Sequence, residues 1–598
     1  MRKNQILIFL LSLFIPVLIF SNTSIERCQP YSFALHSKRG ENLSFAQKQC
    51  LTNLQFINQL FLISYAPMNW KVENIGLNFD QEMAKTVTRV KNRLLPESTD
   101  FQMLIKNLLF SFKDYHVLPT FYSTGYAMLP FQIQSAHGRY FIVEILSDDE
   151  EFLLSVGDEI ISFEGIDIHK VMEIFKRQAV GSNYLPTDQA LAELFFTQRM
   201  GFLGHPLPRN SSVNIVVRSK ETGDLLTYTV EWYQEEEVVS PLPLSYNFAK
   251  GVTSASKAQK SKAKQTRSFL KKSFMTPYYK ALSFSHRFDA EPSMTLGAKK
   301  SMIPILGPVL WSASEEGDFH AYLFELPSGK KGGYVRIPSY ETGEDGEKLA
   351  KQFGEIIKVF EEQSDVLLID QLNNPGGSAP YVYGLLSMLT DQPLEVPLHR
   401  LKLTQEDVCE AGTLIADLES TDDLKDWTDI FGETFDGLPL SETFRKGFID
   451  ACYFIIDQWN QGKLFTDFHP LYGLETVEPN PEVHYTKPIV VLINSLDFSG
   501  GDFFPAIMQD NKRAILLGTR TAGAGGCVDI VSFRNLSGIE EVSVTASFAL
   551  RPNREPIENL GVTPDIVYNL SVIDLQEGYR EYKKRILEEL EKHGNTDF

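Results

Sequence analysis

The chain has 598 residues, which is enough for about three or four domains of ordinary size and for a large buried core. Hydrophobic residues make up 43% and charged residues 22% of the sequence, a globular composition that excludes a disordered, collagen-like or coiled-coil protein. The 57 Lys and Arg residues against 77 Asp and Glu residues give a net charge of -20, so we expect no nucleic-acid partner for the molecule as a whole.

The cysteines are too few and too scattered for a disulfide framework. There are five of them: Cys28, Cys50, Cys409, Cys452 and Cys527. No CxxC motif or Cys/His cluster has the spacing of metal ligands. We therefore expect neither a structural metal nor another cofactor.

The N-terminus has the layout of a secretory signal peptide, which we place at residues 1–23. Arg2 and Lys3 precede an apolar run from Ile6 to Phe20, and small polar residues follow. A retained signal anchor is the alternative, but the run is short for a membrane span and Pro16 interrupts it. No later segment has about 18 consecutive apolar residues, so we expect an exported, soluble protein without a stable membrane span.

The next two regions differ in the period of their apolar residues. Residues 24–128 show helix-period positions such as Leu54, Ile57 and Phe61, which predict a helical N-terminal domain. Residues 129–235 contain short β-type runs bounded by Gly, Asp and Ser, among them FQIQ, RYFIVEIL, GDEIISFEGIDI and VNIVVRS. These runs predict a small β domain.

A basic segment at residues 236–300 separates these regions from the rest. Between Lys250 and Lys300, twelve Lys or Arg residues stand against only Asp289 and Glu291. Part of it, GVTSASKAQKSKAKQTRS, has too few large apolar residues to fold alone. It is either a solvated linker or a segment that docks on the acidic remainder of the protein and is cut at exposed sites, as in a zymogen.

Residues 301–598 have an α/β pattern. GYVRIPSY is a strand candidate, EKLAKQFGEIIKVFEEQ an amphipathic helix, and DVLLID an apolar strand that ends in the turn QLNNPGG. A polar, helical insertion at 400–475 interrupts the pattern, which resumes with KPIVVLIN, AILLG, VDIVSF and VSVTASFAL. A helical tail from Asp574 to His593 closes the chain.

Ser499 is the candidate nucleophile. The strand IVVLIN runs into SLDFSGGDFF, which places this serine at a glycine-containing junction before a helix. Such a serine exposes its hydroxyl at the carboxyl end of a strand, near free backbone N–H groups, as acyl transfer requires. A helix N-cap is the alternative role, and the motif G-x-S-x-G of α/β-hydrolases is absent.

Four motifs in order resemble the tail-specific, or C-terminal processing, peptidase superfamily. They are DVLLID with NNPGG, IVVLIN with Ser499, GTRTAGAGG, and ENLGVTPD. The segment SVGDEIISFEGIDIHKV resembles the core of a PDZ domain, which these proteases carry beside the catalytic core. The resemblance implies an α/β multidomain fold: a helical N-terminal domain, a PDZ-like domain at 129–235, and a catalytic core at 301–598.

One departure from the superfamily pattern concerns the catalytic base. Members that use a Ser-Lys dyad place the lysine in a T-x-G-K-G turn, whereas the matching turn here is TAGAG, with Ala524 in that place. Either the protein is inactive or another group accepts the serine proton. The subfamily without the lysine uses a histidine from before the PDZ-like domain and a late glutamate, which match His116 and Glu558 here.

The stretches SFKDYHVLP, LDFSGGDFFPA and REPIENLGVTPD resemble secreted serine proteases of chlamydiae within this superfamily. That resemblance implies that Ser499 is the nucleophile, that His116 is the general base and that Glu558 orients it. The oxyanion hole would be formed by backbone N–H groups of Gly500 and of Gly376 or Gly377. Gly500 stands where we expect cysteine in this group.

The function implied is that of a secreted serine endopeptidase. It would be made as a zymogen, activated by self-cleavage within residues 246–300 and by homodimerisation, and exported into the inclusion lumen and the host cytosol. There it would cleave host-cell proteins as a virulence factor. His116 precedes the basic segment and Ser499 follows it, so the cut halves must stay associated. The alternatives are an inactive PDZ-like scaffold and a periplasmic C-terminal processing protease.

Overall fold

The computed structural model describes residues 43–92, 98–147, 152–181, 184–235, 273–275, 293–343, 345–418, 427–428 and 432–594. The expected signal peptide at 1–23 and most of the basic segment at 236–300 lie outside the described residues. Within the part that is described, no helix is both long and apolar enough to cross a membrane.

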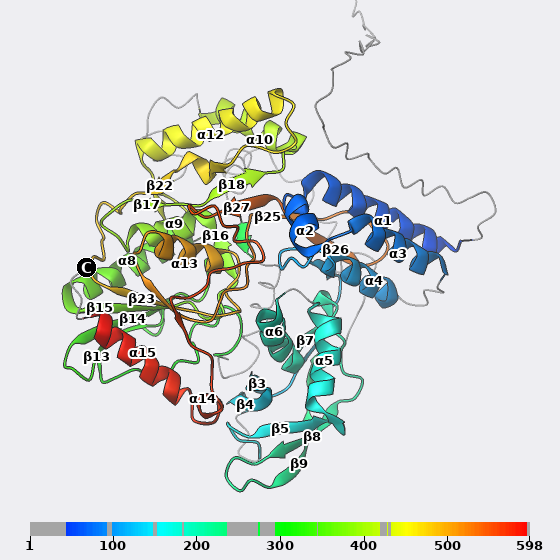
Figure 1. The fold of residues 1–598 in the computed structure, drawn as a ribbon, viewed down its shortest axis with the longest axis vertical. Coiled ribbons are helices and arrows are strands. Elements are labelled where there is room, and N and C mark those ends of the chain that lie inside the picture. The colour runs from blue at the N-terminus through cyan, green and yellow to red at the C-terminus, as the bar shows by residue number, and fades with distance from the viewer. Residues whose placement is uncertain are drawn as a thin grey trace, which may run out of the picture. The chain divides into compact units, whose positions relative to one another are not determined.

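The N-terminal part of the described chain is helical, as its apolar period predicts (Figure 1, blue). It contains α1 (Phe45–Ser64), α2 (Met68–Ile75), α3 (Phe79–Asn92) and α4 (Ser98–Phe110). Helix α1 begins after Ser44, whose hydroxyl accepts the N–H of Gln47 at 3.2 Å, while the Gln47 side chain accepts the N–H of Ser44 at 2.9 Å. This capping box satisfies two donors that the first turn of a helix leaves free.

The region expected as a small β domain contains a sheet and two helices. The sheet has the order β3-β4-β5-β8-β9, with β6 beside β5. Its strands are β3 (Phe131–Ala136), β4 (Arg139–Ile145), β5 (Glu159–Phe163), β6 (Ile166–Asp167), β8 (Ser212–Arg218) and β9 (Leu225–Glu231). A second small sheet, β10-β2-β7, joins β2 (Tyr126–Met128), β7 (Gln198–Met200) and β10 (Tyr233–Glu235).

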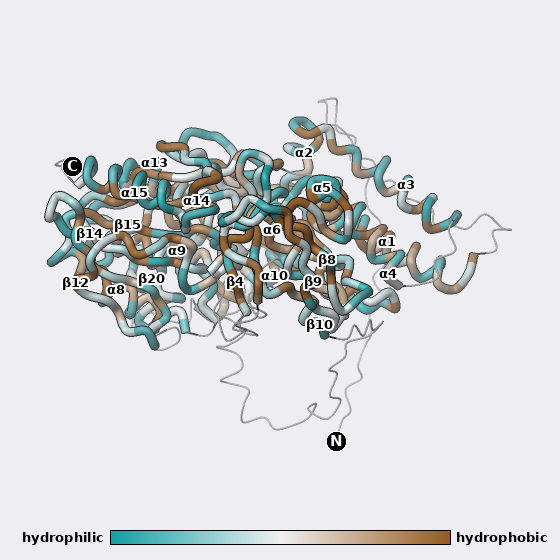
Figure 2. The backbone as a smooth tube through the Cα atoms, turned by 90° about the horizontal axis from the view of Figure 1, so that it is seen from below, coloured by the Kyte–Doolittle hydropathy of each residue, from teal (hydrophilic) through white to brown (hydrophobic). Residues whose placement is uncertain are grey.

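The helices α5 (Ile168–Ala179) and α6 (Leu185–Thr197) were not predicted. Helix α6 has the sequence LPTDQALAELFFT and buries its last seven residues, Leu191–Thr197, without a break. It therefore lacks the polar stripe by which a surface helix is recognised. Figure 2 shows the hydrophobic surroundings of α6 in brown.

The region expected to be catalytic is built on a seven-stranded sheet with the order β12-β13-β14-β15-β23-β24-β28. Its strands are β12 (Val309–Ser312), β13 (Ala321–Glu325), β14 (Lys331–Arg336), β15 (Val366–Asp370), β23 (Ile489–Ile493), β24 (Ile515–Gly518) and β28 (Ile566–Val567). From β14 to β28 the pairing is parallel. Every residue of β15 and β23 is buried, as in parallel sheets that are covered on both faces.

Helices cover both faces of this sheet. Leu367 and Ile369 of β15 share a core with α8 (Gly346–Gln363), α9 (Ala379–Ser387) and α13 (Gly500–Asp510). Val366 and Leu368 point to the other face and share a core with α15 (Arg580–His593), which follows the short helix α14 (Val572–Gln576). The expected helical tail is therefore two helices, with Tyr579 in a left-handed conformation between them (φ 60°).

The insertion expected at 400–475 contains α10 (Gln405–Leu418) and α12 (Glu442–Asn460), drawn above the sheet in Figure 1. The short elements around it are β17 (Leu394–Glu395), β18 (Leu398–Leu401), β19 (Thr434–Phe435), β20 (Leu438–Pro439), β21 (His469–Pro470), the 3-10 turn η5 (Leu471–Gly473) and β22 (Thr476–Val477). Cys452 is buried within α12, whereas Cys409 on α10 is exposed.

A five-stranded sheet, β1-β26-β25-β11-β16, joins distant parts of the chain. It contains β1 (Pro119–Phe121), β11 (Ser273–Met275), β16 (Gly376–Ser378), β25 (Val528–Val531) and β26 (Ile539–Thr545). Strand β27 (Ser547–Leu550) pairs with β18 instead. The runs VDIVSF and VSVTASFAL therefore do not continue the parallel sheet: β25 and β26 pair antiparallel with each other, and β1 and β11, which are far away in sequence, flank them.

We predict that Ile369→Ala, in the fully buried strand β15, lowers the free energy of unfolding of the core by about 2–5 kcal/mol. The transition in which the parallel sheet unfolds, followed by circular dichroism in urea, measures this loss. Ile63→Ala is the matched control, because that isoleucine is 57% exposed. Equal losses in the two variants would contradict the assignment of β15 to the core.

Candidate active site

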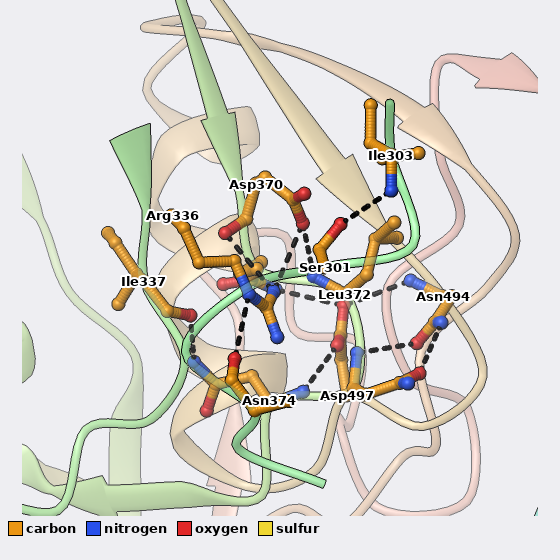
Figure 3. Close-up of polar contacts among 12 residues, drawn as sticks. Ser301, Ile303, Arg336, Ile337, Asp370, Leu372, Asn374, Asn494 and Asp497 are labelled. Atoms are coloured by element: carbon orange, nitrogen blue, oxygen red, sulfur yellow. Dashed lines mark hydrogen bonds and ion pairs between the residues drawn. The ribbon is translucent and has the colours of Figure 1, made fainter. Parts of the chain in front are cut away.

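The carboxyl ends of β15 and β23 bring two loops together. Asp370 pairs with Leu492 in the parallel register, so the turn after β15 and the loop after β23 leave the same edge of the sheet. Asp497 connects them (Figure 3): its carboxylate accepts the N–H of Asn374 at 3.0 Å and the N–H of Asn494 at 2.9 Å. Asp497 is fully buried, and such a satisfied buried carboxylate fixes the backbone that surrounds it.

A buried ion pair also stabilises this edge of the sheet, where β14 and β15 end. Arg336 at the end of β14 lies 3.1 Å from the carboxylate of Asp370, and both side chains are almost inaccessible to solvent. Asn374 completes the connection because its side-chain amide donates to the carbonyl of Ile337 at 3.0 Å. The turn that carries the predicted oxyanion glycines is thereby held from both neighbouring strands.

Ser499 lies at the N-terminus of α13 in a strained conformation, with φ 57° and ψ -109°. Strain of this kind in a non-glycine residue is typical of functional sites and of nucleophile turns. Its N–H donates to Asp502 Oδ2 at 2.8 Å, while its Oγ has no hydrogen-bond partner among the described residues. Contrary to the expectation of an exposed hydroxyl, Ser499 is fully buried in this structure.

The predicted oxyanion glycines lie beside the serine. A β-carbon at Gly500 would lie 3.2 Å from the Cα of Gly376 and 3.3 Å from the nitrogen of Gly377, so glycine at 500 permits a close approach. Gly377 has φ 153°, and a β-carbon there would lie 1.9 Å from the carbonyl carbon of Tyr340. The N–H of Gly376 already donates to Asn374 Oδ1 at 2.9 Å. Gly377 and Gly500 are therefore the better candidates.

His116 lies in the loop between α4 and β1 and is fully buried. Its backbone N–H donates to Asp114 Oδ1 at 2.9 Å, and its carbonyl accepts from Ser543 Oγ at 2.5 Å. The ring of Tyr115 packs edge-on against Phe498, which directly precedes the candidate nucleophile, with ring centroids 5.5 Å apart. This contact joins the histidine loop to the nucleophile loop. In the described part of the chain, neither ring nitrogen of His116 has a hydrogen-bond partner.

Asp114 supports the histidine loop through the backbone. It is 4% exposed, and its Oδ2 accepts the hydroxyls of Tyr65 and Thr545, each at 2.8 Å. These contacts connect helix α1 and strand β26 to the residue two positions before the histidine. Asp114 therefore fixes the position of the His116 backbone.

Glu558 is fully buried and is held by two partners. Its Oε2 accepts the N–H of Gly525 at 3.0 Å, and its Oε1 accepts a hydrogen bond from the ammonium of Lys71. The next residue, Asn559, donates to the carbonyl of Lys113 at 2.7 Å, which ties the glutamate to the histidine loop. No hydrogen bond joins the described side chains of Glu558 and His116. The predicted residues thus meet in one buried region, but the hydrogen bonds of a working triad are not formed.

The turn in which dyad members carry a lysine is present and is anchored under the serine. Asp502 accepts the N–H groups of Gly523 and Ala524, each at 2.9 Å, and also that of Ser499. Asp502 was not singled out from the sequence, although an acid three residues after a helix-starting serine is the signal of a cap. Lys71, which donates to Glu558, was not predicted from the sequence as a residue of the site either.

Burial dominates the electrostatics of the site. It lowers the pKa of His116 to about 4; nearby Asp114 opposes this effect and Lys71 adds to it. It raises the pKa of Glu558 to about 8, with Asp114 adding to the rise and Lys71 opposing it. The imidazole is therefore neutral at physiological pH, the form that a general base needs.

Comparisons with known proteins identify relatives of this chain. Residues 331–568 match peptidase family S41, and residues 125–239 match the PDZ domain. An uncharacterised protein of Chlamydia muridarum is 33% identical over 98% of this chain and 96% of its own length. The crystal structure of mature CPAF, the Chlamydia protease-like activity factor, superposes with a TM-score of 0.78 at 30% identity, covering 93% of this chain and 99% of that one. The resemblance to C-terminal processing peptidases is also confirmed, since 16% of the chain matches the carboxy-terminal-processing protease of Bartonella bacilliformis at 30% identity, over 21% of that protein.

These matches confirm the fold expected from the sequence motifs, with the PDZ domain before the peptidase domain. They also confirm the resemblance of the chain as a whole to the chlamydial protease. The chain belongs to peptidase family S41 and is a serine peptidase.

Proposed function

We propose that this chain is a secreted serine endopeptidase that is made as an inactive precursor and activated by self-cleavage. In the active enzyme, Ser499 Oγ attacks the scissile carbonyl while His116 accepts its proton and then returns it to the leaving amine. Glu558 orients the imidazole and stabilises its charged form. The N–H groups of Gly377 and Gly500 hold the negative oxygen of the tetrahedral intermediate.

The observation that carries the proposal is the position of β11. This strand belongs to the predicted inhibitory segment and pairs antiparallel with β16, with Phe274 opposite Gly377 and Met275 opposite Gly376. On its other side, Ser273 pairs with Val528 of β25. An extended peptide can bind a protease by adding a strand to a sheet in this way. Strand β11 therefore lies where a substrate strand would reach the oxyanion glycines, which agrees with the burial of Ser499.

Contacts across the segment support the expectation that the cut halves remain together. The N-terminal half holds the C-terminal half through β1 and β26, where Pro119 pairs with Val542. The Tyr115–Phe498 ring contact and the bonds of Asp114 to Thr545 and of Asn559 to Lys113 add to this interface. None of these contacts involves residues 236–300, so removal of the segment leaves them in place.

The wider role rests on similarity. The expected signal peptide at 1–23 supports export, and from the resemblance to chlamydial proteases we propose that activation is accompanied by homodimerisation. By the same similarity, we propose export into the inclusion lumen and host cytosol and cleavage of host-cell proteins as a virulence factor. Protein substrates themselves follow from the peptidase family.

A catalytically inactive scaffold is the second candidate. Ala524 in place of the dyad lysine, and a His116 ring that has no hydrogen bond among the described residues, favour it. The endopeptidase is better supported, because a scaffold gives no reason for a strand of the basic segment to pair with the glycines beside Ser499. A C-terminal processing protease would differ in requiring a free substrate C-terminus.

We predict that the purified wild-type chain at neutral pH converts to two associated fragments cut within residues 246–300, whereas Ser499→Ala stays intact. Gel electrophoresis and intact mass follow the cut, and size-exclusion chromatography follows the association and any change to a dimer. If neither chain is cut and neither cleaves a denatured protein, the scaffold is correct. If only substrates with free C-termini are trimmed, the enzyme is a C-terminal processing protease.

We also predict that the His116 ring in the intact Ser499→Ala chain stays neutral until the pH falls to about 4, because burial lowers its pKa. An unfolded chain protonates this ring below about pH 6.5. The residue therefore favours folding above that pH, and this contribution is lost as the pH falls from about 6.5 toward 4.

Histidine-selective NMR measures this titration, with the resonance assigned by its loss in His116→Gln. Cleavage of the segment should move the midpoint upward, toward about 6.5, because the ring then gains contact with solvent. A midpoint near 6.5 already in the intact chain would contradict the closed state.

A further inference from the structure

Helix α2 docks on the rest of the protein through a charged residue. Lys71 is the one buried residue of this eight-residue helix, and its side chain is 0% exposed. Burial of a lysine is costly unless its charge is paired and its hydrogen-bond donors are satisfied. The position of Lys71 therefore requires an explanation from its partners.

All three donors of the Lys71 ammonium are used. It donates to Glu558 Oε1, to Asn559 Oδ1 at 2.8 Å and to the carbonyl of Lys113 at 2.9 Å. The carboxylate of Asp114 lies 3.9 Å away. These partners lie outside the basic segment, so they persist when that segment is released.

The charges around this ammonium bear on the proposed chemistry. Lys71 lies between two buried carboxylates, those of Glu558 and Asp114, near the neutral His116 ring. Tyr65 faces the same group from the end of α1 and donates to Asp114. The ammonium favours the charged form of Glu558, which burial opposes, and a charged Glu558 balances the positive charge that His116 gains when it accepts the serine proton. Without Lys71, the two carboxylates would repel each other in a region of low dielectric.

We propose that Lys71 is a positioning residue of the active site: its buried ammonium holds the Glu558 carboxyl group in place and favours its charged form against burial, so that Glu558 can support His116. This inference rests on the proposed triad and assigns it a fourth residue, from the helical N-terminal domain. The second oxygen of Glu558 is fixed by Gly525. Together the two partners set the orientation of the carboxylate, and free lone pairs remain for the imidazole.

The protonation of Glu558 tests the proposal without any need for activity. Infrared difference spectroscopy of the intact Ser499→Ala chain follows the carbonyl stretch of the protonated acid, assigned by its loss in Glu558→Gln. We expect a midpoint near pH 8. In Lys71→Met it should move higher by about one to three pH units, because removing an adjacent opposite charge raises the pKa of an acid. Lys71→Arg should stay close to the parent. An unchanged midpoint in Lys71→Met would overturn the proposal.

Activity provides the second readout. Lys71→Met should lower kcat/KM for an internal peptide substrate by about 10²-fold or more at pH 7 and shift the acidic limb of the pH profile upward. When Lys71→Met is added to the Glu558→Gln variant, kcat/KM should fall by less than about twofold further, because Lys71 acts through Glu558. Lys71→Met alone leaves the Glu558 carboxylate buried without its partner and can prevent folding. The double variant removes both members of this buried pair, so it remains folded in that case. A double variant far slower than Glu558→Gln would overturn the proposal.

Lys106→Met is the matched control. Lys106 is also fully buried, and its ammonium donates to the carbonyls of Leu203 at 2.7 Å and Gly204 at 3.2 Å. Its loss should reduce stability without shifting the pH profile; a shift equal to that of Lys71→Met would overturn the specific role of Lys71. If Glu558→Gln cleaves as fast as wild type, Glu558 is not part of the triad and the proposed function is wrong on that point. If Lys71→Met still shifts the infrared midpoint of Glu558, the electrostatic pairing of Lys71 with Glu558 is correct all the same.

Discussion

Strands β15 and β23 lie side by side and parallel, so the turn that follows one and the loop that follows the other leave the sheet at the same edge. Asp497 then joins the turn to the loop, and the helix that begins after Ser499 packs on the face that Leu367 and Ile369 also line. The remaining parts of the site are added to this edge from elsewhere. His116 belongs to the N-terminal domain and is placed by the contact of Tyr115 with Phe498 and by the pairing of its loop with β26. Glu558 belongs to the C-terminal part and is placed by its hydrogen bond from the N–H of Gly525. A change that separates β15 from β23 would therefore separate Ser499 from the oxyanion glycines of β16.

The sequence predicted well those elements whose signal is local. DVLLID and IVVLIN are continuous apolar runs bounded by turn residues, and both are buried strands of the parallel sheet. Pairing between distant segments was not accessible in this way. VDIVSF forms β25, which pairs with the next strand β26 but also with the distant strand β11, and no period in the sequence encodes that second pairing. Helix α6 was missed for a related reason, since its buried surroundings leave no polar face to mark it.

The candidate site was predictable to different degrees. Ser499 follows from local sequence, because a strand, a serine and two glycines before a helix form one short pattern. His116 and Glu558 have no such pattern and were found only through family resemblance. Lys71 carries no signal at all: a single lysine in a short amphipathic helix predicts a solvated side chain, and only the folded protein shows it bound to Glu558. The burial of Ser499 and His116 was also beyond the sequence, because it depends on what packs over the sheet edge.

The central claim is that His116 and Glu558 activate Ser499 once the basic segment has left the glycines of β16. The most direct measurement is the rate at which a fluorophosphonate probe labels the chain before and after cleavage within residues 246–300, with the labelled residue identified by mass spectrometry. The account predicts labelling at Ser499 in the cleaved chain, slow labelling of the intact chain, and a loss of about 10²-fold or more in His116→Gln. Labelling of Ser499 at the same rate in His116→Gln and in the wild type would contradict it.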